Sequence, residues 1–191
     1  MTPRFRVIGV DLLERDVRLR MPFRFGVATL TEAPQAFARA RIRLEDGREA
    51  VGAAAELLVP KWFDKDPALS NEDNVEQLRR SLARARVGYL AHEARSAWEH
   101  STPGTGLVHN YGPALLDRAL LDALCRALEL PFYRAVGANL VGAPKMEGIA
   151  LGEFLATLKP RTSIAARHTV GLLDPITAAD VRQRVNDGLP E

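Results

Sequence analysis

The first 58 residues have the hydrophobic patterns of β-strands, separated by a loop and a turn. Residues 5–20 are rich in Val, Ile and Leu and predict a long first strand or a pair of strands, which Pro22 interrupts. Residues 36–44 place Ala, Ile or Leu at every second position with Phe or Arg between them, which predicts a second strand with one charged face. Asp46-Gly47 favours a hairpin turn before a third strand. We therefore expect a three-stranded antiparallel meander over residues 5–58, with residues 21–32 as a loop.

The middle of the chain has the hydrophobic spacing of α-helices. Ser70 and Asp73 form a variant capping box, and apolar residues spaced by three or four positions follow it. Pro113 marks the first turn of a second helix, whose wide apolar face ends before Pro131. We therefore expect helices over residues 70–130.

The hydrophobic pattern of the last part of the chain predicts a connector, one strand and one helix. Residues 142–160 predict a connector, with a domain boundary near Pro160. Residues 163–171 predict a strand, and a capping box at Thr177 opens a helix that stops at Gly188. A lone strand and a lone helix cannot bury both of their faces. We expect them to be the first step of a repeating βα architecture.

Composition and charge narrow the class of protein. The chain has 191 residues, of which 47% are hydrophobic and 26% are charged, which suits one domain or one domain and a piece of a second. A net charge of +2 with interleaved basic and acidic residues does not indicate nucleic acid as a partner. The single cysteine, Cys125, excludes an internal disulfide and favours a cytoplasmic location. No apolar run of about 18 residues indicates a membrane span.

Four segments carry a recognisable order of motifs: residues 20–26 (Arg-Met-Pro-Phe-Arg-Phe-Gly), Asp46-Gly47 with residues 52–56, residues 114–123 (Ala-Leu-Leu-Asp-Arg-Ala-Leu-Leu-Asp-Ala), and residues 131–142. In this order and spacing, the chain from about Phe5 to its end resembles the N-terminal capping domain of the mandelate racemase/muconate lactonizing branch of the enolase superfamily.

The resemblance implies an α+β fold: the meander and a helical cap over residues 1–160, then residues 161–191 as the opening βα unit of an incomplete (β/α)8 barrel. A complete barrel takes about 250 residues, so we expect a fragment without its catalytic barrel. In the family, a Lys or His base on later barrel strands removes a proton next to a carboxylate, and three carboxylates hold Mg²⁺, which stabilises the enediolate. No catalytic residue and no metal ligand carries over. We expect Mg²⁺ only in the full-length parent and no activity from this chain alone.

The resemblance also implies that two loops close over the substrate, residues 21–32 and 53–66. Aromatic walls exclude water, and a cation holds a substrate carboxylate. The candidate substrate-capping residues are Pro22, Phe23, Arg24, Phe25, Thr29, Trp62, Phe63 and Lys65. Two interpretations stand for Arg24, which either faces substrate or is solvated. Two also stand for the pair Trp62-Phe63, which belongs either to the pocket rim or to the core.

Other polar residues indicate no second site. Asp117 and Asp122 lie about 140° apart around a helix and do not form a catalytic pair. The histidines show no metal-ligand spacing. We expect a structural or barrel-lining role for His168, while His92, His100 and His109 lie in loops or at helix ends with no partner pattern.

Two functional hypotheses follow. The first is the substrate-capping and specificity domain of a Mg²⁺-dependent enzyme that abstracts a proton next to a carboxylate, of racemase, dehydratase or cycloisomerase type. The second is a stand-alone binding or assembly module that pairs with a separate barrel chain or with itself. In the first case the partner is a small carboxylate substrate, and a homo-oligomer is possible in both. An apolar strand at residues 164–170 favours the first hypothesis, because in a stand-alone module it would be an exposed pairing edge.

Overall fold

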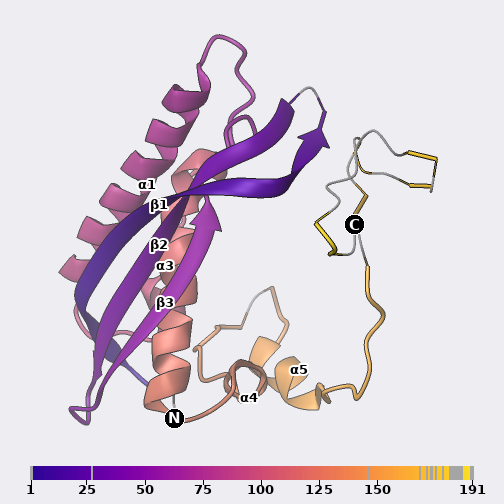
Figure 1. Cartoon of the computed structure of the whole chain (residues 1–191). Helices are drawn as coiled ribbons and strands as arrows, with labels where there is room; N and C mark the ends of the chain where they lie inside the picture. Colours follow the sequence, from indigo (N-terminus) through magenta and orange to yellow (C-terminus); the bar gives the residue numbers. More distant parts are fainter. Residues whose placement is uncertain are drawn as a thin grey trace.

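A three-stranded antiparallel sheet forms one layer of the molecule, and two long helices form the other (Figure 1). The computed structural model describes residues 2–26, 28–145, 147–167, 169–170, 172, 174, 176–177, 179–180 and 187–189. The sheet has the order β1-β2-β3, with β1 at Phe5–Phe25, β2 at Ala28–Leu44 and β3 at Glu49–Leu57. The helices are α1 (Asn71–Ala91), α2 (Ala97–His100), α3 (Gly106–Ala127), α4 (Phe132–Gly137) and α5 (Leu151–Thr157). The predicted α+β meander followed by helices is confirmed.

The first two strands continue into a projecting hairpin where the sequence predicted a loop. Phe23 pairs with Leu30 and Phe25 with Ala28, so the prediction of a loop at residues 21–32 is wrong. The register of the β1–β2 pairing is irregular between Arg18 and Phe23, where Pro22 lies. A proline is tolerated there because β1 is an edge strand and the irregularity removes the need for its missing N–H.

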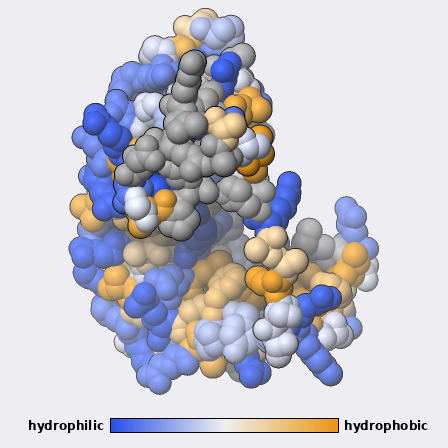
Figure 2. Space-filling view, turned by 45° about the vertical axis from the view of Figure 1, so that its right-hand side comes forward, coloured by the Kyte–Doolittle hydropathy of each residue, from blue (hydrophilic) through white to orange (hydrophobic). Residues whose placement is uncertain are grey.

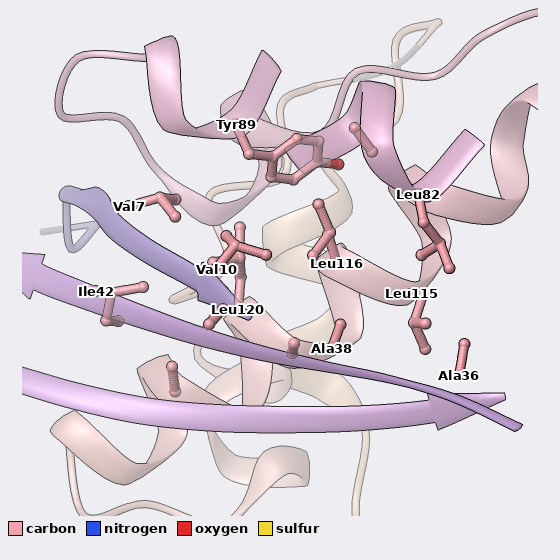
Figure 3. Packing of buried hydrophobic residues seen from close by; sticks show 14 of the residues in the cluster. Val7, Val10, Ala36, Ala38, Ile42, Leu82, Tyr89, Leu115, Leu116 and Leu120 are labelled. Atoms are coloured by element: carbon pink, nitrogen blue, oxygen red, sulfur yellow. The ribbon is translucent and has the colours of Figure 1, made fainter. Parts of the chain in front are cut away.

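The core lies between the sheet and the two long helices. Ala36, Ala38 and Ile42 of β2 are buried, whereas the arginines between them are exposed, which confirms the predicted alternation. Figure 3 shows side chains of β1 and β2 facing Leu115, Leu116 and Leu120 of α3 and residues of α1. The small alanines of the strands let the helices approach, and the leucines fill the space between them.

Helix α3 begins at Gly106, so the prediction that it begins at Pro113 is wrong. A proline inside a helix lacks the N–H that would bond the carbonyl four residues earlier, here that of His109. The buried Ser81 of α1 supplies the replacement, because its hydroxyl donates to the His109 carbonyl at 3.1 Å. The same hydroxyl oxygen accepts from the Gly112 N–H at 3.0 Å. A side chain from the neighbouring helix thus stabilises α3 across the proline.

Helix α3 also crosses very close to β3. A Cβ at Gly52 would lie 2.1 Å from the backbone nitrogen of Ala123, so only glycine fits there. The carboxylate of Asp122 accepts a hydrogen bond from the Ala53 N–H at 2.9 Å. The helix therefore contacts the edge strand through both packing and a hydrogen bond.

The segment after α3 contains two short helices. The prediction that residues 142–160 form a connector is wrong in part, since α5 lies within it. Hydrophobic residues gather in the lower part of the face seen in Figure 2. Large hydrophobic side chains exposed in this segment of the chain are Leu130, Phe132, Tyr133, Ile149, Phe154 and Leu158.

Residues 161–167 and 169–170 form no strand, so the strand predicted at residues 163–171 is wrong for these described positions. A strand requires a partner for its backbone groups, and the sheet of the described residues ends at β1 and β3. Ile164 is 87% exposed. His168 and most of the last predicted helix, residues 181–186, lie outside the described residues. The division of the chain at Pro160 stays a prediction.

Candidate functional site

Three aromatic side chains from the two predicted capping segments lie together at the projecting hairpin. The ring of Phe25 lies 5.2 Å from that of Trp62, edge to face, and 5.8 Å from that of Phe23, centroid to centroid. Trp62 is 53% exposed, while Phe23 and Phe25 are half-buried. We call Phe23, Phe25 and Trp62 the aromatic rim. Edge-to-face contacts of this kind hold two segments in a defined relative position.

The loop that carries Trp62 is fixed by polar contacts from both sides. The Lys61 N–H donates to the side chain of the buried Asn74 at 2.9 Å, and its ammonium donates to the carbonyls of Asp66 and Leu69. Lys61 itself has a φ of 60°, in the left-handed region. Lys61 thus joins two carbonyls of its own loop and Asn74 of α1, a role that its local sequence does not indicate.

Asp64 adds a further anchor for the same loop. Its carboxylate accepts from the Asp66 N–H at 3.0 Å and from the Gln77 side chain at 3.0 Å. The Asp66 N–H, followed by the Gln77 amide, holds the pKa of Asp64 below its usual range. The carboxylate stays ionised and keeps the loop attached to α1.

The other aromatic residue of this loop has a different environment. Phe63 packs edge to face on Tyr111 of α3, with ring centroids 5.1 Å apart. It is half-buried against the core cluster. The two residues therefore differ: Trp62 lies at the exposed aromatic rim, whereas Phe63 packs against the core.

The remaining predicted site residues surround the rim without joining it. Arg24 is exposed and lies opposite the exposed Thr29 in the β1–β2 register. Pro22 and Lys65 are exposed as well. The structure therefore brings Phe23, Phe25 and Trp62 together and leaves the polar candidates at the surface nearby.

An ion pair holds the sheet against α1 below the hairpin. The guanidinium of Arg79 donates to both oxygens of Glu14, at 3.0 and 2.6 Å. This bidentate contact lowers the pKa of Glu14. It joins β1 to α1 and so fixes the base from which the hairpin projects.

A second polar cluster was missed by the sequence analysis. The carboxylate of Asp117 on α3 accepts from the hydroxyl of Tyr89 at 2.6 Å and from that of Ser101 at 2.7 Å. Burial raises the pKa of Asp117, while the two hydroxyl donors act in the opposite direction. These three residues come from distant parts of the chain, and only the tertiary fold brings them together.

His92 and His100 form a pair that the sequence also concealed. Their Nδ1 atoms lie 3.4 Å apart, and the Nε2 of the fully buried His100 lies 2.8 Å from the carbonyl oxygen of Phe5. Because that carbonyl accepts only, Nε2 of His100 donates, and its Nδ1 accepts from His92. Burial lowers the pKa of both imidazoles, and Arg95 lowers that of His92 further.

Within the described residues, no three His, Cys, Asp or Glu side chains lie close enough together to hold a metal ion. No helix in that part of the chain has the length and hydropathy that a membrane crossing requires.

Comparison with solved structures finds similarity to members of the enolase superfamily over about 70% of this chain. An enolase from an alpha-proteobacterium, solved with Mg, is 18% identical, with a TM-score of 0.47 over 70% of this chain and 34% of that one. The L-Ala-D/L-Glu epimerase of Bacillus subtilis is 20% identical, with a TM-score of 0.42 over 70% and 34% of the two chains. The muconate lactonizing enzyme of Pseudomonas fluorescens, solved with muconolactone, is 17% identical, with a TM-score of 0.43 over 69% and 34%.

The chain spans about a third of the length of these solved structures. They come from the superfamily that the sequence resemblance named. No protein-family model matches the sequence, and no curated protein matches it.

Proposed function

We propose that this chain is the substrate-capping and specificity part of a Mg²⁺-dependent enzyme of the enolase superfamily, one that removes a proton next to a carboxylate. The observation that carries the proposal is the contact of Phe25 with Trp62, which joins the two segments expected to close over a substrate. In this proposal the enzyme is cytoplasmic and acts as a racemase, dehydratase or cycloisomerase on a small carboxylate.

The aromatic rim suits such a cap for a physical reason. Abstraction of a weakly acidic proton depends on electrostatic stabilisation, which water weakens. Apolar rings over the mouth of a site exclude water, and their shape selects the group next to the carboxylate. Arg24 and Lys65 lie close in sequence to the rim and are exposed, so they are the proposed cations for a substrate carboxylate.

The proposal places no catalytic base and no metal ligand in residues 1–191. Mg²⁺, when bound in the larger enzyme, would stabilise developing negative charge. The contribution of this chain is limited to positioning, selection and exclusion of water.

The test begins with the coding sequence beyond codon 191 and the protein that it encodes. A continuation with Asp, Glu and Asp at successive strand ends is expected. In that longer protein, Trp62→Ala and Phe25→Ala should lower kcat/KM by about 10- to 100-fold, the range for loss of an apolar pocket contact. Val87→Ala, on an exposed position of α1, is the matched control and should leave kcat/KM unchanged.

Two results would count against the proposal. Mg²⁺-dependent turnover by the purified chain of 191 residues would show that the chemistry lies within it. A continuation without the three carboxylates would favour the stand-alone module, and the molar mass in solution would then show whether the chain pairs with itself.

A further inference from the structure

A cavity of about 360 Å³ lies where α2, α3, α4 and the segment just after α4 meet. Its lining includes Trp98, Ser101, Asp117, Leu121, Val136 and Val141, and it shares no residue with the aromatic rim. A volume in this range is typical of pockets for small molecules. The cavity is therefore a separate feature that the proposed capping function leaves without a role.

The walls of this cavity are largely apolar, with one hydrogen-bonded pair of polar groups. Leu121, Val136 and Val141 supply hydrophobic surface, whereas Asp117 and Ser101 are its polar lining groups. A carboxylate in such surroundings is penalised unless its charge is compensated. Burial accordingly raises the pKa of Asp117.

The carboxylate keeps capacity for another donor. Its two contacts among the described residues are the hydroxyls of Tyr89 and Ser101, one on each oxygen, and no basic side chain of that part of the chain pairs with it. A carboxylate has about four acceptor sites, so roughly two remain. The two hydroxyls orient the carboxylate but leave its negative charge in place. A bound cation would neutralise that charge.

Trp98 lines the same cavity and is 44% exposed. An indole ring attracts organic cations through its π face, and the attraction grows when the cation is partly desolvated. A carboxylate, an indole and aliphatic walls around one cavity are the groups that recognise an ammonium ion carrying an apolar body.

We propose that the cavity between α2, α3 and residues 136–141 binds a small organic amine, with its ammonium group on Asp117 and its apolar part against Trp98, Leu121 and Val136. The inference is independent of the proposed capping function, because it uses none of the rim residues.

Benzylamine is the probe, and benzyl alcohol is its neutral counterpart of nearly equal size. Isothermal titration calorimetry on the full chain should show saturable binding of benzylamine at millimolar concentration, with benzyl alcohol about 10- to 100-fold weaker, the range for a hydrogen bond to a charged group. In a Trp62→Phe background, Trp98 is the only tryptophan, and its fluorescence should change with the same midpoint.

Asp117→Asn should weaken benzylamine binding by about the same 10- to 100-fold factor. The matched control is Asp122→Asn, five residues further along α3, whose carboxylate accepts from the Ala53 N–H of β3 and should not affect amine binding. Val136→Phe fills the cavity and should abolish binding while the circular dichroism spectrum stays native.

Absence of saturable binding, equal affinity for the alcohol, or unchanged binding by Asp117→Asn would overturn the proposal. If Asp117→Asn fails to fold, Val136→Phe decides: undiminished binding by that folded variant would place the amine elsewhere.

Discussion

The hydroxyl of Ser81 on α1 donates to the carbonyl oxygen of His109 on α3, the carbonyl that Pro113 leaves without its usual helical donor. One side chain thus makes a proline compatible with the interior of a neighbouring helix. Ser81 and Pro113 are therefore energetically coupled, although nothing in the sequence around either residue indicates the other.

A double-mutant cycle measures that coupling. Ser81→Ala should lower the free energy of unfolding by about 1–3 kcal/mol, because it leaves a buried carbonyl unsatisfied. In a Pro113→Ala background the restored backbone N–H bonds His109, so the same change should have a smaller effect. Urea unfolding of the four proteins gives the coupling energy. Equal effects of Ser81→Ala in both backgrounds would show that the serine does not compensate for the proline.

The contact between α1 and α3 predicts opposite effects at two helical glycines. A Cβ at Gly112 would lie 2.3 Å from the Ser81 carbonyl oxygen, so Gly112→Ala should destabilise by about 1–3 kcal/mol through overpacking. At Gly88 nothing lies within 4 Å, and Gly88→Ala should stabilise by about 0.4–1 kcal/mol through the unfolded chain. Thermal and chemical unfolding measure both changes. A Gly112→Ala protein with the stability of the wild type would argue against the close contact between α1 and α3.

The His92–His100 pair predicts a loss of stability in mild acid. Burial keeps both imidazoles neutral in the folded state and lowers their pKa values from 6.5. Below about pH 6.5 the unfolded chain therefore binds more protons than the folded one, so the free energy of unfolding falls as pH falls. Urea midpoints across this range measure the effect.

Substitution at the pair should reduce that pH dependence. Glu93, Arg95 and Glu99 are the charged residues of the surrounding segment, and Tyr89 stacks on His92. They stay in place in His92→Gln and His100→Gln, whose midpoints should vary less between neutral pH and mild acid. His109→Gln, on an exposed ring of α3, is the control. A wild-type slope retained in both pair variants would assign the acid sensitivity to other groups.

The rim contact predicts a change in the fluorescence spectrum of Trp62. In a Trp98→Phe background, Phe25→Ala should shift the emission of Trp62 to longer wavelength, because the indole loses its ring neighbour and gains water. The free energy of unfolding should fall by about 0.5–1.5 kcal/mol for the lost ring pair, in addition to the lost burial of Phe25. Thr29→Ala, on the same hairpin, should leave the emission unchanged. An unchanged spectrum in Phe25→Ala would mean that the two segments do not meet in solution.

Hydrogen exchange tests the part of the chain that forms no strand. The amides of residues 164–167 and 169–170 should exchange much faster than those of β2, because the exposed Ile164 lies in a segment without strand pairing. Full protection of these amides in a monomer would contradict the structure there.

The sequence predicted the sheet well where the side chains themselves decide the structure. The alternation around Ala38 and Ile42 is local, and so is the Asp46-Gly47 turn. It failed at Pro22 and Pro113, since proline usually marks an end but is tolerated at an edge-strand irregularity or beside a replacement donor. The residues around Pro113 do not indicate that Ser81, on another helix, supplies the missing hydrogen-bond donor.

The candidate site divides in the same way. Phe25 and Trp62 were predicted as cap residues, but their contact depends on the hairpin that replaced the expected loop. From the sequence, Asp117 could be compared only with Asp122 on the same helix, because spacing rules describe one helix at a time. Tyr89 approaches Asp117 through the packing of α1 on α3, and Ser101 through the packing of α2 on α3; together they make it a buried polar centre.

The hydrogen bond from Ala53 to Asp122 has a consequence for how the molecule behaves among its own copies. Strand β3 ends the sheet, and an outer strand with free donors invites another chain to add to it. Asp122 already occupies one of those donors, and its negative charge stands where an incoming backbone would have to place a carbonyl oxygen. We therefore expect Asp122 to disfavour the pairing of β3 with a strand of another copy, and a neutral, shorter side chain at this position to weaken that effect.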